Sequence, residues 1–122
     1  GVTKATTYIN AATVYKAFSL PENAVPLFFK AQEIYERELD KSDARLGGLY
    51  NNMALALADV SRFDEAEALY QKAIEVMRSI TDHEGEVAIT YLNLATMIEK
   101  KLGLVEGDEQ IRAYLEQGFY YE

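Results

Sequence analysis

Apolar residues recur every three or four positions along much of the chain, with polar residues between them. The clearest runs are Tyr50, Met53, Ala54, Leu57 and Val60, followed by Ala66, Leu69, Tyr70, Ala73, Ile74 and Met77. Spacings of 3, 4, 7 and 10 residues from Tyr50 place these side chains on one face of an α-helix. The same pattern predicts helices near residues 3–18, 22–40, 43–60, 63–80, 85–102 and 108–121. Because the connections are short, we expect neighbouring helices to be antiparallel.

The first helix of each predicted pair carries a repeated motif. Residues 7–12, 49–54 and 90–95 align without gaps, at intervals of 42 and then 41 residues. Each segment has a tyrosine, an asparagine and an alanine in the same places: Tyr8, Asn10 and Ala12; Tyr50, Asn52 and Ala54; Tyr91, Asn93 and Ala95. A fixed period of this length indicates a stack of helical hairpins.

The second helix of each pair repeats as well. Residues 24–31 align with residues 66–73, again 42 positions apart, and the third copy is residues 111–118, a further 45 positions along. The extra residues fall in the glycine-containing segment 102–108, which we expect to be a loop. The chain is therefore predicted to be a single all-α domain, residues 1–122, with three hairpins at residues 3–42, 43–84 and 85–122.

Small and capping residues indicate how each hairpin is built. Ala12 and Ala24 in the first hairpin, like Ala54 and Ala66 in the second, are expected to face each other where the helices cross. Ser61 lies three residues before Asp64, and Ser19 three before Glu22. This spacing predicts that the serines cap the helices that follow them.

The second repeat resembles a tetratricopeptide repeat (TPR). The resemblance rests on Tyr50, Asn52, Met53, Ala54 and Leu57, then Ser61, Phe63, Ala66, Tyr70, Lys72, Ala73 and Ile74. Its period of about 42 residues exceeds the usual 34 of the family and is similar to the longer repeats of kinesin light chains, as is Asp82-His83 between hairpins. The resemblance implies six antiparallel helices in a right-handed α-α superhelix, whose concave face binds proteins or peptides.

The resemblance also implies which residues line that concave face. In the three repeats they are Asn10, Thr13 and Lys16; Asn51, Asn52 and Leu55; and Asn93, Thr96 and Lys100, with Thr6, Ile9, Gly48, Asp59, Leu92 and Glu99 beside them. Some TPR domains clamp a terminal carboxylate with Lys and Arg. The matching positions here are Thr6, Ile9, Gly48, Asn51, Ile89 and Leu92, which include no cation. Neutral or apolar peptide anchors are therefore favoured.

The asparagine ladder, Asn10, Asn52 and Asn93, allows two interpretations. An asparagine side chain both donates and accepts hydrogen bonds, so the ladder could pair with the N–H and C=O groups of an extended peptide. Alternatively, these residues could bond neighbouring repeats and fix how the hairpins stack. The two roles can coexist.

Composition limits the possible partners and location. The chain has 12 basic and 20 acidic residues, a net charge of −8 and no cysteine. Nucleic-acid binding needs clustered cations, so we expect no nucleic-acid partner. We read the acidity as a solvated surface, with a basic partner as the alternative. No apolar run approaches the roughly 20 residues of a membrane span, and we expect a cytoplasmic protein, although its N-terminus at Gly1 could be truncated.

No group of residues suggests catalysis or a cofactor. The only histidine, His83, lies among Asp82, Glu84 and Glu86, but one imidazole beside acids typical of a helix start makes a poor metal site. There is no phosphate-binding glycine loop and no spaced nucleophile and base. We therefore expect no enzyme activity, no metal and no cofactor.

The expected function is that of an interaction scaffold binding an extended peptide or a partner helix. A regulatory or sensory module of a larger signalling protein and a structural spacer are the alternatives. The chain ends in the aromatic run Phe119, Tyr120 and Tyr121 without a polar capping helix. It is therefore expected to be a fragment of a longer protein, or to self-associate through these rings.

Overall fold

The computed structural model describes residues 1–80 and 84–116, with side chains through residue 103, and these residues are helical apart from the turns. Five helices follow in order: α1 (Val2–Ala17), α2 (Pro21–Glu38), α3 (Ala44–Asp59), α4 (Phe63–Arg78) and α5 (Glu84–Glu116). The first four lie within two residues of the predicted ranges. Within the described residues, none of the helices combines the length and apolarity needed to cross a membrane.

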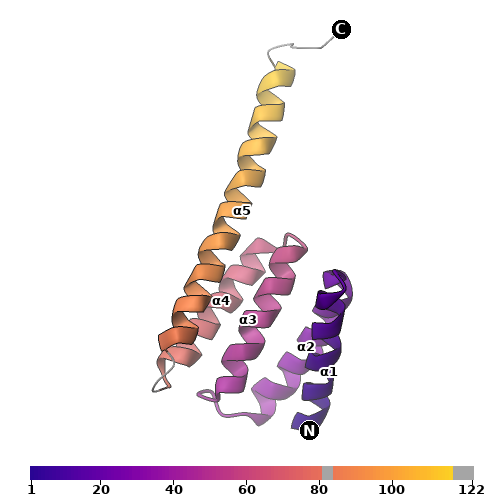
Figure 1. The fold of residues 1–122 in the computed structure, drawn as a ribbon, viewed down its shortest axis with the longest axis vertical. Helices are drawn as coiled ribbons and strands as arrows, with labels where there is room; N and C mark the ends of the chain where they lie inside the picture. The colour runs from indigo at the N-terminus through magenta and orange to yellow at the C-terminus, as the bar shows by residue number, and fades with distance from the viewer. Residues whose placement is uncertain (81–83, 117–122) are drawn as a thin grey trace.

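The helices pack as antiparallel pairs in two layers. α1 packs against α2 and α3 against α4, while α2–α3 and α4–α5 contacts join successive pairs. In Figure 1, α1, α3 and α5 form the layer nearer the viewer, and α2 and α4 lie behind it. This confirms the two predicted hairpins of residues 1–80 and places the first helix of each repeat in one layer.

Alanines at the helix crossings let the backbones approach closely. Ala12 and Ala24 are completely buried, as are Ala54 and Ala66. Four of the largest fully buried side chains belong to α3 or α4, namely Leu49, Met53, Leu57 and Tyr70, and the others are Phe28 on α2 and Thr90 on α5. The second repeat thus provides most of the core, in keeping with its regular spacing of apolar residues.

The two hairpin turns differ from the predicted capping arrangement. Ser61 has φ 64°, in the left-handed region, and ends α3. Its N–H donates to the carbonyl of Ala58 at 3.0 Å, and the N–H of Arg62 donates to that of Leu57 at 2.8 Å. These two bonds define a Schellman motif. Ser19, with φ 59°, occupies the equivalent place after α1. The serines therefore end one helix rather than cap the next, and no side chain caps α2 or α4.

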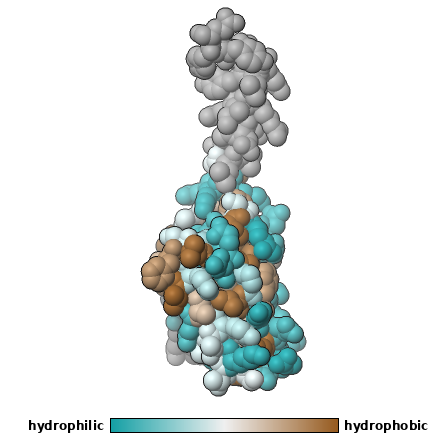
Figure 2. Space-filling view, turned by 90° about the vertical axis from the view of Figure 1, so that its right-hand side faces the viewer, coloured by the Kyte–Doolittle hydropathy of each residue, from teal (hydrophilic) through white to brown (hydrophobic). Residues whose placement is uncertain are grey.

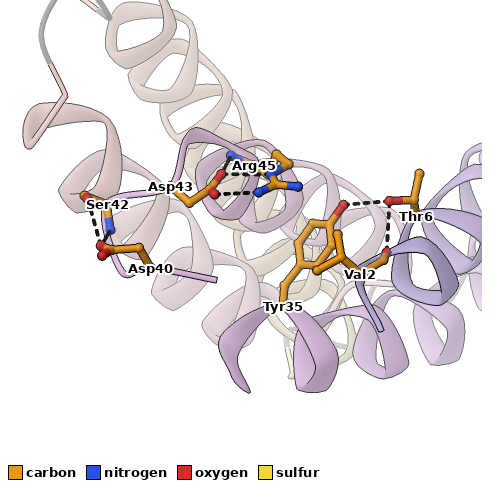
Figure 3. Close-up of polar contacts among 7 residues, drawn as sticks. All are labelled: Val2, Thr6, Tyr35, Asp40, Ser42, Asp43 and Arg45. Atoms are coloured by element: carbon orange, nitrogen blue, oxygen red, sulfur yellow. Dashed lines mark hydrogen bonds and ion pairs between the residues drawn. The ribbon is translucent and has the colours of Figure 1, made fainter. Parts of the chain in front are cut away.

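The junction between the hairpins is held by short-range polar contacts, which Figure 3 shows. Asp43 caps α3, since its carboxylate accepts from the N–H of Arg45 at 2.9 Å and pairs with the Arg45 guanidinium at 2.8 Å. These hydrogen bonds, chiefly from the side chain, lower the pKa of Asp43. The side chain and backbone of Ser42 bond Asp40 in the same way. The turn is thus fixed where α3 begins.

The third repeat departs from the prediction. Residues 84–116 form one continuous helix, α5, where two helices and a loop at residues 102–108 were expected. The third hairpin is therefore not formed over these residues. Glycine in a helix costs only about 1 kcal/mol relative to alanine, and no proline follows Gly103 or Gly107 to end the helix. The expected aromatic end, Phe119 to Tyr121, and the Asp82-His83 pair lie outside the described residues.

Candidate protein-binding face

The predicted binding residues lie on α1, α3 and α5, the three helices of one layer (Figure 1). We call their shared surface the α1–α3–α5 face. It comprises Asn10, Thr13 and Lys16 on α1, Asn51, Asn52 and Leu55 on α3, and Asn93, Thr96 and Lys100 on α5. None of these nine residues is buried. The structure thus brings them to one layer and leaves each of them accessible.

The asparagines of this face differ in their hydrogen bonding. The Asn93 amide nitrogen donates to the Asn51 side-chain oxygen at 3.3 Å, linking α5 to α3. The link goes to Asn51, not to Asn52, the expected neighbour in the ladder. Among the described residues, the side chains of Asn10 and Asn52 have no hydrogen-bond partner. One asparagine therefore joins adjacent repeats, while two keep their amide groups open to solvent.

The threonines of the face use their hydroxyl protons within their own helices. Thr13 donates to the carbonyl of Ile9 at 2.8 Å, and Thr96 to that of Leu92 at 2.9 Å. This is the usual i−4 bond of a helical threonine. Both hydroxyls remain acceptors but no longer offer a free donor, so the face is less polar than its sequence suggests. Thr6 likewise donates to the carbonyl of Val2 at 3.1 Å, and its hydroxyl also lies 3.1 Å from that of Tyr35 on α2 (Figure 3).

The C-terminal ends of α1 and α3 carry opposite charges on this face. Lys16 is half-buried, and burial lowers its pKa while the nearby Asp59 carboxylate acts in the opposite direction. Asp59 also acts on Tyr70, whose pKa is raised to about 12, mainly by burial. Lys16 and Asp59 therefore partly neutralise each other, and this end of the face favours neither charge strongly.

Apolar side chains accompany the polar ones on the α5 part of the face. Ile89 is 57% exposed and Leu92 is 65% exposed, whereas Leu55 on α3 is half-buried. According to the resemblance to TPR domains, both residues match positions at which a carboxylate-binding TPR domain would carry its cations. This part of the face suits an apolar group better than a carboxylate.

A pocket of about 720 Å³ lies on the other side of the chain, among α2, α3 and α4. This pocket was not predicted from the sequence. Tyr50 donates a hydrogen bond to Glu36 at 2.8 Å, and the Lys72 ammonium lies 5.6 Å from the centre of the Tyr50 ring. Burial, followed by the bond to Glu36, raises the pKa of Tyr50. The bond from Tyr50 on α3 to Glu36 on α2 joins the two hairpins, so the tyrosine of the repeat motif also links adjacent repeats.

Exposed apolar residues also gather where α1 turns into α2. Phe18 is 75% exposed, Val14 55% and Leu20 44%. Figure 2 looks onto this side of the molecule and shows brown side chains among teal ones. Arg62 lies over Phe29 nearby, 5.6 Å from the ring centre. The exposure of these side chains was not predicted from the sequence.

Among the described residues, no three His, Cys, Asp or Glu side chains gather closely enough to hold a metal ion. His83 and Asp82, the residues considered for such a site, are not among them.

Comparison with known proteins agrees with the repeat pattern. Residues 45–103 match the family model described as tetratricopeptide repeat. The matched segment includes nearly all of α3, all of α4 and the first part of α5. No curated protein matches the chain. The match supports the TPR family for this helical-repeat chain.

Proposed function

We propose that this tetratricopeptide-repeat chain binds an extended segment of a partner protein along the α1–α3–α5 face. TPR domains generally mediate protein–protein interactions, which supports a protein partner. The observation that carries the proposal is the pair of unpartnered amides, Asn10 and Asn52, one in each hairpin. An amide can bond both the N–H and the C=O of an extended backbone, and such bonds hold a peptide whatever its side chains are.

Apolar side chains beside these amides favour a partner with apolar anchors. Ile89 and Leu92 are more than half exposed on α5. Leu55 belongs to α3, the helix that lies between α1 and α5 in this layer. Burying such side chains would contribute about 25 cal/mol for each Å² removed from water. The partner segment is therefore expected to present aliphatic or aromatic residues, and its specificity to arise from them rather than from a terminal carboxylate.

A selection from a random peptide library displayed on phage tests the proposal. Peptides enriched on the wild-type chain are tested on a variant with Asn10→Ala and Asn52→Ala. The matched control carries Asn23→Ala and Gln71→Ala, two exposed amides on α2 and α4. The proposal expects the first variant to lose most of the enriched peptides and the control to keep them. Equal retention by both variants would contradict it, as would enrichment of peptides that bind only as helices.

Stability measurements on the same variants separate binding from architecture. The side chains of Asn10 and Asn52 form no hydrogen bond with another described residue. Their replacement should therefore leave the melting temperature close to that of the wild type. Asn93→Ala leaves Asn51 without its partner and should lower the stability by about 1 kcal/mol. A large loss of stability in the Asn52→Ala variant would assign the ladder to repeat stacking instead.

Several finer features belong to the same proposal. The period of about 42 residues supports a repeat of the kinesin-light-chain type. The net charge of −8 supports a protein rather than a nucleic-acid partner. A cytoplasmic location fits such a scaffold. The chain is proposed to bind rather than to catalyse, and a spacer without a binding role is the outcome if no peptide is enriched.

A further inference from the structure

α5 has an uncovered apolar stripe on a side that faces away from Asn93 and Thr96. Tyr91 is 43% exposed, Ile98 38% and Leu102 55%. Ala88 and Ala95, also exposed, continue the same line. We call the five residues, Ala88, Tyr91, Ala95, Ile98 and Leu102, the α5 seam. They are spaced by 3, 4, 3 and 4 positions, the spacing at which apolar residues recur along a two-helix coiled coil.

The corresponding residues of α3 show what such a seam requires. Tyr50, Ala54 and Leu57 stand 41 positions before Tyr91, Ala95 and Ile98, and they are only 6%, 0% and 1% exposed. Helix α4 packs against α3, with the Lys72 ammonium 5.6 Å from the centre of the Tyr50 ring. In α5 the seam has no such helix over it within the described residues, apart from the Arg78 guanidinium, which donates to the Tyr91 hydroxyl at 2.6 Å. The pattern therefore calls for a second helix packed along the seam.

The continuity of α5 excludes its own later residues from that place. Residues 111–116, part of the segment whose sequence aligns with α4, continue straight along the same helix in Figure 1. At 1.5 Å per residue, Ala113 lies about 27 Å along the axis from Ala95. An unbroken helix cannot fold back onto its own seam. Residues 104–116 therefore do not cover the seam, which is open to a helix of a second copy.

The seam is complementary to itself in an antiparallel arrangement. If two α5 helices are related by a twofold axis between Ala95 and Ile98, Tyr91 lies opposite the Leu102 position and Ala95 opposite the Ile98 position of the second copy. The pair of Ala95 and Ile98 thus joins a small side chain to a large one, as close packing requires. A twofold interface of this kind is the commonest in homo-oligomers.

Charge also permits this pairing. Residues 84–103 contain three glutamates and two lysines, a net charge of −1, while the whole chain carries −8. The seam itself contains no charged residue. Two copies can therefore approach along α5 with little of the repulsion that the rest of the surface would cause.

We infer that the chain forms an antiparallel homodimer in which the α5 seam of one copy packs against the α5 seam of a second copy. The interface leaves the α1–α3–α5 face open, because Asn93 and Thr96 lie on the far side of α5. Dimerisation would thus present two peptide-binding faces in one particle and does not depend on the proposed peptide binding.

Sedimentation of the full 122-residue chain over a range of concentrations tests the inference. The wild type should shift from monomer to dimer as concentration rises, and Ile98→Glu, which places a charge in the seam, should remain monomeric. Val14→Glu is the matched control, because it changes an exposed apolar residue on α1 to the same acid and should still dimerise. Circular dichroism checks that both variants are folded. A monomeric wild type, or dimerisation of folded Ile98→Glu, would overturn the inference.

The absence of cysteine from the sequence permits a direct test of the antiparallel arrangement. Chains with Tyr91→Cys and chains with Leu102→Cys are mixed and oxidised. The antiparallel pair predicts a disulfide between the two kinds of chain and little within either kind alone. A disulfide that forms mainly between two Tyr91→Cys chains would instead show a parallel pair and overturn the antiparallel assignment.

Discussion

Gly47 and Gly48 are adjacent in α3 but have different surroundings, so replacing each with alanine should affect stability differently. A Cβ atom at Gly48 would meet no atom within 4 Å. A Cβ atom at Gly47 would lie 3.0 Å from the Cε and 3.2 Å from the Cγ of Met77, and 3.5 Å from a Val76 methyl carbon. Both of these neighbours belong to α4. The pair of variants therefore probes how closely the two helices of the second hairpin pack.

The expected magnitudes follow from two effects. Alanine is more favourable than glycine inside a helix by about 0.8–1.0 kcal/mol, and both positions gain this amount. At Gly47 the added methyl group overpacks a buried contact, which typically costs about 1–3 kcal/mol. The Met77 Cγ is close to the backbone and cannot move as freely as the Cε. Gly48→Ala should thus stabilise the chain by about 1 kcal/mol, and Gly47→Ala should be less stable than Gly48→Ala by about 1–3 kcal/mol.

Urea unfolding followed by circular dichroism measures both variants against the wild type. The midpoint should rise for Gly48→Ala and stay unchanged or fall for Gly47→Ala, with unchanged slopes. Equal stabilisation by the two substitutions would refute the reasoning, because it would mean that α3 and α4 do not approach at Gly47 as the structure shows.

Two further predictions concern the turn and the tyrosines. Ser61→Gly should stabilise the chain by about 0.5–1 kcal/mol. The left-handed conformation costs a non-glycine residue about 1–2 kcal/mol, and the greater entropy of unfolded glycine offsets about 0.5–1 kcal/mol of the gain. Thermal unfolding measures the change, and an unchanged or lower melting temperature would contradict it. Tyr70 has a folded-state pKa of about 12, above its value of about 10 in the unfolded chain, so its contribution to stability is complete below pH 10 and is lost between about pH 10 and 12. Tyr70→Phe should therefore make the free energy of unfolding less sensitive to pH in that window. Urea titrations at several alkaline pH values measure this, and a pH dependence equal to that of the wild type would contradict the raised pKa of Tyr70.

The fold of residues 1–80 follows closely from the sequence because local spacing and packing agree there. Apolar residues at helical spacing and alanines at Ala54 and Ala66 specify both the helices and their crossing. α5 is different, since two glycines and a longer interval suggested a loop. Gly103 and Gly107 permit a loop but do not enforce one, and helical hydrogen bonds continue through them. Only the balance between helix continuation and hairpin packing decides this point, and spacing alone does not reveal it.

The candidate face was predictable as a surface but not in its hydrogen bonds. The resemblance to tetratricopeptide repeats assigned Asn10, Asn52 and Asn93 to the concave side of their helices. Whether Asn93 meets Asn51 or Asn52 depends on the axial offset between α5 and α3, which sequence spacing does not determine. The turn serines show the same limit, because Ser61 is compatible with a helix start as well as a helix end. Its backbone conformation, fixed by the close approach of α3 and α4, decides between the two.

The most direct test of peptide binding is a calorimetric titration of one selected peptide into the wild type, Asn52→Ala and Gln71→Ala. Loss of the hydrogen bonds made by one amide should weaken binding by about 1–1.5 kcal/mol, or roughly tenfold in Kd. We predict that Asn52→Ala binds about tenfold more weakly, with an unchanged melting temperature, and that Gln71→Ala binds like the wild type. Equal affinity for Asn52→Ala and the wild type would contradict binding along the α1–α3–α5 face.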